Sequence, residues 1–210
     1  MDWQPIQARL GVVADGIAGP KTYAALFRAM GARENADALG KQAARDFTLY
    51  GLTTPLRIAH FMAQAAHETG GFKWLREIWG PTPAQLRYEG RNDLGNVQPG
   101  DGKRFMGRGI FQLTGRANYE RAGKAIGQPL ASQPELAERP DIAVTTACDY
   151  WQSRGLSALA DRDDVLAVTK KVNGGTNGLN DRKVQLAKAK GLLLLSLIHI
   201  SEPTRQEAIS

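Results

Sequence analysis

The chain has 210 residues, of which 42% are hydrophobic and 23% are charged, so it can form one sizeable core with at most a small appendage. These proportions argue against disordered, collagen-like and coiled-coil proteins. A formal net charge of +6 favours an anionic partner, either a nucleic acid or an acidic polymer. The single cysteine, Cys148, excludes an internal disulfide bond and a zinc site built from several thiolates.

The beginning of the chain, MDWQP, lacks the basic and apolar regions of a secretory signal peptide. No apolar run approaches the ~20 residues that cross a membrane as a helix. We therefore expect a soluble protein that is made in a cytoplasm and has no stable membrane insertion.

Helix start and stop signals recur along most of the chain. Flanking Pro and Gly residues, with Thr54 as an N-cap, delimit segments of helical period. They predict helices over residues 21–30, 34–50, 56–68, 117–126, 141–153, 164–172 and 181–190.

Between these helices, residues 70–115 hold many Gly and Pro and little clear period, which predicts irregular loops with at most a short hairpin near residues 104–113. The predicted fold class is therefore mainly α. Because long loops in compact domains usually carry function, we expect the chemistry in residues 68–115.

Two glutamates flank a diglycine turn at the start of this loop-rich segment. Glu68 ends an apolar helix, where aromatic residues are expected to shield it partly from water, and Glu77 follows nine residues later. A partly shielded carboxyl suits a general acid, and an inverting glycosidase needs two carboxyls about 6.5–9.5 Å apart with a water between them. By itself the pair is a weak signal, since two glutamates are more often ordinary surface residues.

Aromatic residues crowd the same segment. They are Phe72, Trp74, Trp79 and Tyr88. Flat rings suit the faces of sugars, but these residues are equally well explained as a cap on the core beneath a long loop.

Other chemistries find little support in the sequence. Arg108 lies between two glycines, but neither the GxxxxGK[ST] pattern nor a GxGxxG that opens a helix after a strand is present. His60 and His67 lack the HExxH spacing, so we expect core or supporting histidines and neither a metal nor another cofactor. The basic residues are scattered along the chain, and no nucleic-acid partner is expected.

Four ordered motifs together resemble glycoside hydrolase family 19, in its phage endolysin branch rather than its plant chitinase branch. They are HETGGF (67–72) with Glu77, GRGIFQLTG (107–115), Asn118-Tyr119, and VNGG (172–175). The resemblance covers roughly residues 40–192. It implies a lysozyme-like, mainly α (α+β) fold and inverting hydrolysis of a β-1,4 bond beside an N-acetylated sugar.

The resemblance also implies roles for individual residues. Glu68 falls on the general acid and Glu77 on the base that activates water, while Thr114 falls on a hydroxyl that helps to hold this water. Further matches are sugar-binding residues, namely Gln112, Asn118, Asn173 and Arg182, with Trp79 and Tyr88 as aromatic candidates. Plant members place the second acid further along the chain, so Glu89 is a rival of Glu77, although its neighbours Arg87 and Arg91 favour a salt-bridged loop residue.

The two ends of the chain differ in character from its middle. Residues 1–32 resemble half of a peptidoglycan-binding module, which leaves open whether this segment binds cell wall or braces the catalytic domain, predicted over residues 33–194. Residues 195–210 resemble an in-frame translation of a sequencing adapter, so we expect the natural protein to end, or to have been truncated, near Leu194.

These features lead to one hypothesis with two alternatives. The first is an endolysin-type muramidase that cuts peptidoglycan and acts as a monomer at the bacterial cell wall after release from the cytoplasm. Its positive charge would draw it to an anionic wall at low salt. The alternatives are a chitinase that acts on N-acetylglucosamine polymers and a catalytically inactive cell-wall-binding protein.

Overall fold

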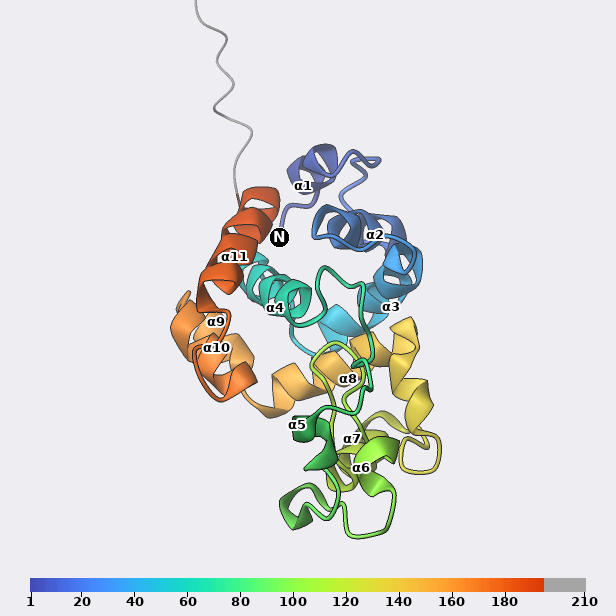
Figure 1. The fold of residues 1–210 in the computed structure, drawn as a ribbon. Helices are drawn as coiled ribbons and strands as arrows, with labels where there is room; N and C mark the ends of the chain where they lie inside the picture. The colour runs from blue at the N-terminus through green and yellow to red at the C-terminus, as the bar shows by residue number, and fades with distance from the viewer. Residues whose placement is uncertain (195–210) are drawn as a thin grey trace, which may run out of the picture.

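Helices make up nearly all of the regular structure in residues 1–194, the part of the chain that the computed structural model describes (Figure 1). The longer helices are α2 (Pro20–Ala29), α3 (Ala36–Leu49), α4 (Pro55–Glu68), α7 (Arg116–Ile126), α8 (Pro140–Ser153), α10 (Val165–Asn173) and α11 (Leu179–Leu193). The shorter ones are α1 (Gln4–Arg9), α5 (Pro83–Leu86), α6 (Asp101–Arg104) and α9 (Leu156–Ala160), with the 3-10 helices η1 (Asn92–Leu94) and η2 (Pro134–Glu138). The prediction of a mainly α fold is confirmed, and every predicted helix is present.

The short hairpin predicted near residues 104–113 is reduced to one pair of residues. Arg108 donates its backbone N–H to the carbonyl of Leu113 over 3.1 Å, and Leu113 donates back over 2.7 Å. The turn between them needs left-handed backbone at Gly109 (φ +75°) and Gln112 (φ +49°). Arg76 adds a single bridge to Arg108, and no β-strand forms within residues 1–194.

A large hydrophobic cluster unites helices from both halves of the chain. α4 packs along α11, α2 packs on α3, and α3 packs on α8; Figure 1 shows α4 and α11 side by side. Within this cluster the ring of Phe61 meets those of Phe47 and Trp151 edge-on, with centroids 5.2 and 5.5 Å apart. This large lobe holds α4, the helix that ends at Glu68, on several sides.

Local sequence explains where α4 begins. Thr54 accepts a 3.3 Å hydrogen bond from the N–H of Arg57 through its side chain, and Pro55 occupies the first turn, where its missing N–H is not needed. Every residue from Ile58 to Ala66 is buried, because neighbouring helices cover the helix nearly all round.

A second, smaller cluster lies at the other end of the molecule from α1 and α2, where Figure 1 shows α5, α6 and α7. Its members are Phe105, Tyr119, Ala122, Leu130, Ala137 and Ile142. α8 joins the two clusters, since Ile142 at its start belongs to the small lobe and Trp151 near its end to the large one. The long central loop is therefore attached to a core of its own.

The first 32 residues are packed into the large lobe. Ile6 of α1 and Phe27 of α2 belong to the same hydrophobic cluster as α4. Arg9 donates from Nε to the carbonyl of Leu192 over 2.9 Å, which ties α1 to the end of α11. This packing favours the brace over a free module, while wall binding by the segment stays a prediction.

Two further sequence-based expectations concern the tail of the chain and its relation to a membrane. Residues 195–210, the predicted adapter-derived tail, lie outside the described residues. Within residues 1–194, none of the helices combines the length and the apolar character that crossing a membrane requires.

Candidate active site

A turn of three left-handed residues directs the chain away from Glu68. Gly70, Gly71 and Phe72 have φ values of +58°, +74° and +63°. Thr69 fixes this turn, because its hydroxyl donates to the carbonyl of Ala65 over 2.6 Å and accepts the N–H of Phe72 over 2.7 Å. Only glycine adopts such backbone without strain, which explains the diglycine.

The N-terminal segment supports the same turn from outside. A Cβ built on Gly31 would lie only 3.0 Å from the Cα of Gly71, so the two backbones touch. Beside this contact, the ring of buried Phe72 meets that of Phe27 edge-on, with centroids 4.9 Å apart. The position of the turn after Glu68 therefore depends on residues from α2 and the following loop.

The carboxylate of Glu68 lies against a buried cation. Its side chain is 21% exposed, and Oε1 accepts a hydrogen bond from Nη2 of Arg182, whose side chain has no exposed surface. Arg182 also donates to Gln64 Oε1 and, over 3.3 Å, to the carbonyl of Asn177. The aromatic shielding expected for Glu68 stays a prediction, and the structure adds a guanidinium as the group that holds its carboxylate.

The same contact corrects the expected position of Arg182. A side chain with no exposed surface does not face a sugar groove, so it reaches a substrate only through Glu68. The motif pointed to this residue, but its depth within the fold depends on the packing of α11 against α4.

His67, beside the acid, is held by the first turn of α11 and by Gly178, which precedes that helix. Its Nδ1 lies 2.6 Å from Oδ2 of Asp181, and this hydrogen bond is the main reason that the pKa of Asp181 is lowered. A Cβ built on Gly178 (φ +70°) would lie 2.2 Å from the imidazole ring. The backbone at Gly178 therefore presses on His67 where only glycine fits.

Glu77 is held by neutral donors. Its Oε1 accepts the N–H of Gly107 over 2.7 Å, and its own N–H donates to the carbonyl of Gly107 over 3.0 Å. Oε2 accepts from Nε2 of Gln85 over 3.3 Å. Gln85 is itself fixed as part of a capping box with Thr82 at the start of α5.

Gly107 brings three of the predicted site residues together. A Cβ built on it would lie 2.4 Å from Oε1 of Gln112 and 3.3 Å from Oγ1 of Thr114, while its N–H reaches Glu77. Gln112 adopts a left-handed conformation, with φ +49°, that is uncommon for a residue with a side chain. Such backbone is kept where the surroundings enforce it, often at functional sites.

A cavity of about 220 Å³ opens beside Thr114. Asn118 donates from Nδ2 to the carbonyl of Thr114 over 2.8 Å, and the Tyr150 hydroxyl donates to the carbonyl of Val172 over 3.1 Å. Burial raises the pKa of Tyr150, and the negative charge of Glu68 raises it further, so Glu68 lies near this wall. The lining residues are Leu94, Arg108, Phe111, Gln112, Leu113, Thr114, Asn118, Arg121, Ala122, Thr146, Ala147, Tyr150, Arg154 and Val172.

The remaining predicted sugar-binding residues lie in two places. The rings of Trp79 and Tyr88 have centroids 6.4 Å apart, and the pKa of Tyr88 is raised first by burial and then by the charge of Glu77. Trp79 and Glu77 line a second hollow. Asn173, at the end of α10, is exposed and donates over 3.4 Å to the carbonyl of Asn177.

Glu89, the alternative second acid, does not form the salt bridge that the sequence led us to expect. Its carboxylate accepts the N–H groups of Gly100 and Gly102, over 2.6 and 2.8 Å, at the start of α6. Arg91 pairs with Asp93 instead. The expected salt bridge of Glu89 is therefore wrong for the described residues, because the backbone amides of a following turn supply its partners.

His60 and His67 belong to no metal site within the part of the chain that the structure describes. Within residues 1–194, no three His, Cys, Asp or Glu side chains gather as metal ligands. His60 is fully buried in α4, with Nε2 2.8 Å from Oδ1 of Asp163, as expected for a core histidine. Burial lowers the pKa of His60 below 6.5.

The sequence matches the model of glycoside hydrolase family 19, described as chitinase class I, over residues 22–166. The chain belongs to glycoside hydrolase family 19. The predicted family and enzyme class are thereby confirmed, and the substrate of this glycoside hydrolase is a polysaccharide. Membership of the phage branch stays a prediction.

Relatives of this family 19 domain come from bacteria and plants. A glycosyl hydrolase family 19 domain-containing protein of Haemophilus influenzae is 30% identical over 159 residues, which are 63% of this chain and 78% of that protein. An endochitinase of Arabidopsis thaliana is 35% identical over 146 residues, which are 68% of this chain and 49% of the endochitinase. The chain thus spans most of the bacterial relative but about half of the plant one.

Solved structures share the fold of the family 19 domain. Chitinase C from Streptomyces griseus superposes with a TM-score of 0.67 at 24% identity, covering 80% of this chain and 75% of that chain. A class IV chitinase from Zea mays gives 0.63 at 20% identity, with coverage of 86% and 94%. At these identities the likeness shows the shared fold alone.

Several residues that build the family 19 site were absent from the sequence-based predictions. Gln64 and Asp181 support Arg182 and His67, and Gln85 supports Glu77. The Thr82–Gln85 capping box was recognisable from its spacing. The other two partners had no local signal.

Proposed function

We propose that this family 19 domain hydrolyses β-1,4 glycosidic bonds of bacterial peptidoglycan with inversion, as an endolysin-type muramidase. The main support is that two partly exposed carboxylates are held by unlike donors. Glu68 accepts from the Arg182 guanidinium, whereas Glu77 accepts from a backbone N–H and a neutral amide. The two carboxyls thus have distinct surroundings, and the resemblance to the family motif assigns Glu68 as the acid and Glu77 as the base.

Glu68 is the proposed general acid. Arg182 donates to Oε1, so that oxygen is engaged as an acceptor and the catalytic proton belongs on Oε2. From Oε2 the proton passes to the glycosidic oxygen as its bond to the anomeric carbon breaks, and the leaving sugar departs as an alcohol. Arg182 thereby acts as a positioning residue.

Glu77 is the proposed general base, with Thr114 beside it. The Thr114 hydroxyl donates to the carbonyl of Gln112 over 3.0 Å, which leaves its lone pairs to accept a hydrogen from water. Glu77 takes the other hydrogen of this water as its oxygen attacks the anomeric carbon from the face opposite the leaving group, so the configuration inverts.

The sugar chain is proposed to contact amide and aromatic side chains. Gln112 and Asn118 line the cavity beside Thr114, and Asn173 follows closely after Val172, another lining residue. Amides both donate and accept hydrogen bonds, as sugar hydroxyls and acetamido groups require. Trp79 and Tyr88, near Glu77, offer ring faces to pyranose rings.

Peptidoglycan is the preferred substrate for reasons of charge and sequence. A chain with a net charge of +6 is attracted to anionic cell walls, and this attraction weakens as salt rises. The motifs resemble the endolysin branch, and residues 1–32 resemble part of a wall-binding module. The enzyme would act on the wall after its release from the cytoplasm.

Mass analysis of peptidoglycan digests tests this proposal, because the sugar at the new reducing end names the bond that was cut. Muramic acid reducing ends are the expected result, together with clearing of outer-membrane-permeabilised bacteria. Replacing Glu68 by Gln keeps an amide oxygen that can accept from Arg182, so the protein should still fold, at a cost in stability, and the rate should fall about 10²–10⁴-fold. Lysis by E68Q at the wild-type rate would refute the acid assignment.

Chitinase activity is the second candidate, and the family description favours it. The matching model is that of chitinase class I, and the Arabidopsis relative is called an endochitinase. Release of N-acetylglucosamine oligomers from chitin with no cut in peptidoglycan would establish this alternative. Wall binding without either cut would favour an inactive wall-binding protein.

A further inference from the structure

The cavity beside Thr114 carries more positive charge than a neutral sugar requires. Three arginines line it, Arg108, Arg121 and Arg154, and no Asp or Glu is among its lining residues. Arg108 already has an anionic partner, because it donates to Glu138 over 2.7 Å, and it also donates to the Tyr119 hydroxyl over 3.1 Å. The unexplained charge therefore belongs to Arg121 and Arg154.

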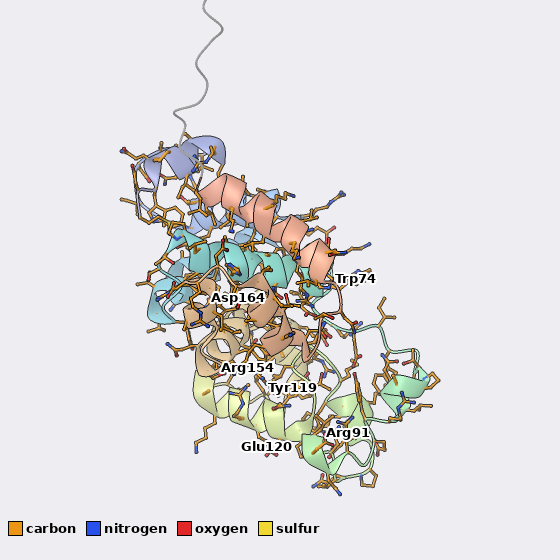
Figure 2. All side chains as sticks on the ribbon, turned by 90° about the vertical axis from the view of Figure 1, so that its left-hand side faces the viewer. Trp74, Arg91, Tyr119, Glu120, Arg154 and Asp164 are labelled. Carbon is orange, nitrogen blue, oxygen red and sulfur yellow. The ribbon has the colours of Figure 1, made fainter. Side chains whose placement is uncertain are left out.

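Two adjacent helices place these arginines at the same cavity. Asn118, Arg121 and Ala122 lie on one face of α7, three and four residues apart, and α7 packs on α8. Tyr150 of α8 also lines the cavity, and Arg154 follows at the C-cap of that helix. Figure 2 labels Arg154 near Tyr119 and Glu120 of α7.

Both guanidinium groups keep donors for a ligand. Arg121 uses one nitrogen for Asp149, over 3.1 Å, and its side chain remains 48% exposed. Arg154 has no carboxylate within salt-bridge distance among residues 1–194, and its guanidinium lies 4.4 Å from the ring centre of Tyr150. Since a guanidinium has five N–H groups in a planar fork, each arginine retains a pair that suits a carboxylate.

Tyr150 connects this charge to the proposed reaction centre. Burial raises the pKa of Tyr150 most; among the charged groups Arg154 and Arg182 lower it and Glu68 raises it, so these three groups lie near this side chain. Because the Arg154 guanidinium lies 4.4 Å from the Tyr150 ring centre, a sugar whose anionic group met Arg154 would lie near the proposed general acid. Acidic groups near the cavity include Glu68, paired with Arg182, Asp149, paired with Arg121, and Glu138, paired with Arg108.

We propose that Arg121 and Arg154 bind a carboxylate carried by the glycan and make the enzyme select an anionic strand over a neutral one. The proposal rests on the proposed glycosidase function and names its substrate class. Chitin carries no carboxylate, whereas every second sugar of peptidoglycan bears a lactyl ether that is either a free acid or extended by a peptide with carboxylates of its own. The chemistry recognised in both cases is a carboxylate.

The test compares three soluble substrates with purified full-length protein. They are glycan strands with their peptides, strands stripped of peptides by an amidase, which frees the lactyl carboxylate, and a chitin hexamer. For Arg121→Gln and Arg154→Gln, the ratio of kcat/KM on a carboxylate-bearing substrate to kcat/KM on the chitin hexamer should fall about tenfold each. Loss on peptide-bearing strands alone assigns the peptide carboxylate, and loss on stripped strands assigns the lactyl carboxylate.

A matched control separates this site from general attraction to the wall. The double variant Arg45→Gln, Lys188→Gln removes two exposed positive charges elsewhere on the surface and should leave the ratio unchanged. An equal fall in the control, or an unchanged ratio in the arginine variants, overturns the proposal. Both results leave the glycosidase function standing, whereas a wild-type protein that cuts none of the three substrates refutes the proposed function itself.

Discussion

Adding one methyl group at Gly107 should disable the site without unfolding the protein. In Gly107→Ala the new Cβ would lie 2.4 Å from Oε1 of Gln112 and 3.3 Å from Oγ1 of Thr114. The first distance is far below van der Waals contact, so the side-chain amide of Gln112, a proposed sugar-binding group, must move by about 1 Å. The change therefore displaces the Gln112 amide, and the 3.3 Å contact also presses on the Thr114 hydroxyl that is proposed to hold the reacting water.

The expected magnitudes follow from this geometry. Overpacking costs typically about 1–3 kcal/mol, and the clashing atom is the end of a flexible side chain, so we expect the low end, about 1 kcal/mol. For a chain of this size that lowers Tm by about 2–4 °C. A displacement of about 1 Å at reacting groups lowers rates by about 10²-fold, so kcat should fall much more than stability.

A double-mutant cycle checks the cause. Gln112→Ala removes the clashing oxygen, so adding G107A to that variant should cost almost no further stability in thermal unfolding. Gly19→Ala is the matched control, because its Cβ would meet only the Ile17 carbonyl, at 3.9 Å. If G107A lowers Tm equally with and without Q112A, the steric argument is wrong.

Three further predictions concern charged groups around the site. Arg182→Met should destabilise the fold by about 3 kcal/mol and lower kcat, because Glu68 loses its buried partner. Chemical unfolding measures the loss of stability and activity assays measure kcat. An unchanged kcat would contradict the positioning role of Arg182. Glu77→Gln should abolish hydrolysis, while Glu89→Gln should lower Tm yet keep kcat, since Glu89 accepts only backbone N–H groups; the reverse pattern would make Glu89 the base. Burial lowers the pKa of His60 below its unfolded value of 6.5, so the unfolded state binds more protons than the folded state near this pH. The free energy of unfolding should therefore fall as pH drops through 6.5, and it should level off below the folded-state pKa. Tm measured from pH 8 to pH 5 shows this slope, and His60→Gln should flatten it; an equal slope in the variant would assign the effect to another group.

The sequence determined the long helices of this protein. α4 was predicted from Thr54 and Pro55, and α7 ends, as expected, before Gly127, which adopts φ +67°. Caps and stop signals act within one turn of the chain, so they can be recognised without knowledge of the fold. The short helices α5, α6 and α9 were not predicted, because four or five residues are too few to show a period.

The motifs also located Glu68, Glu77 and Thr114, but only the tertiary structure decided what surrounds them. Arg182 is 114 positions from Glu68, and nothing near either residue in the sequence indicates that one would be buried beneath the other. Glu89 differs from Glu77 by its partners and not by its residue type. Such contacts arise from the packing of α11 on α4 and of one loop on another, which depends on the whole chain, whereas capping and periodicity depend on neighbours within a few residues.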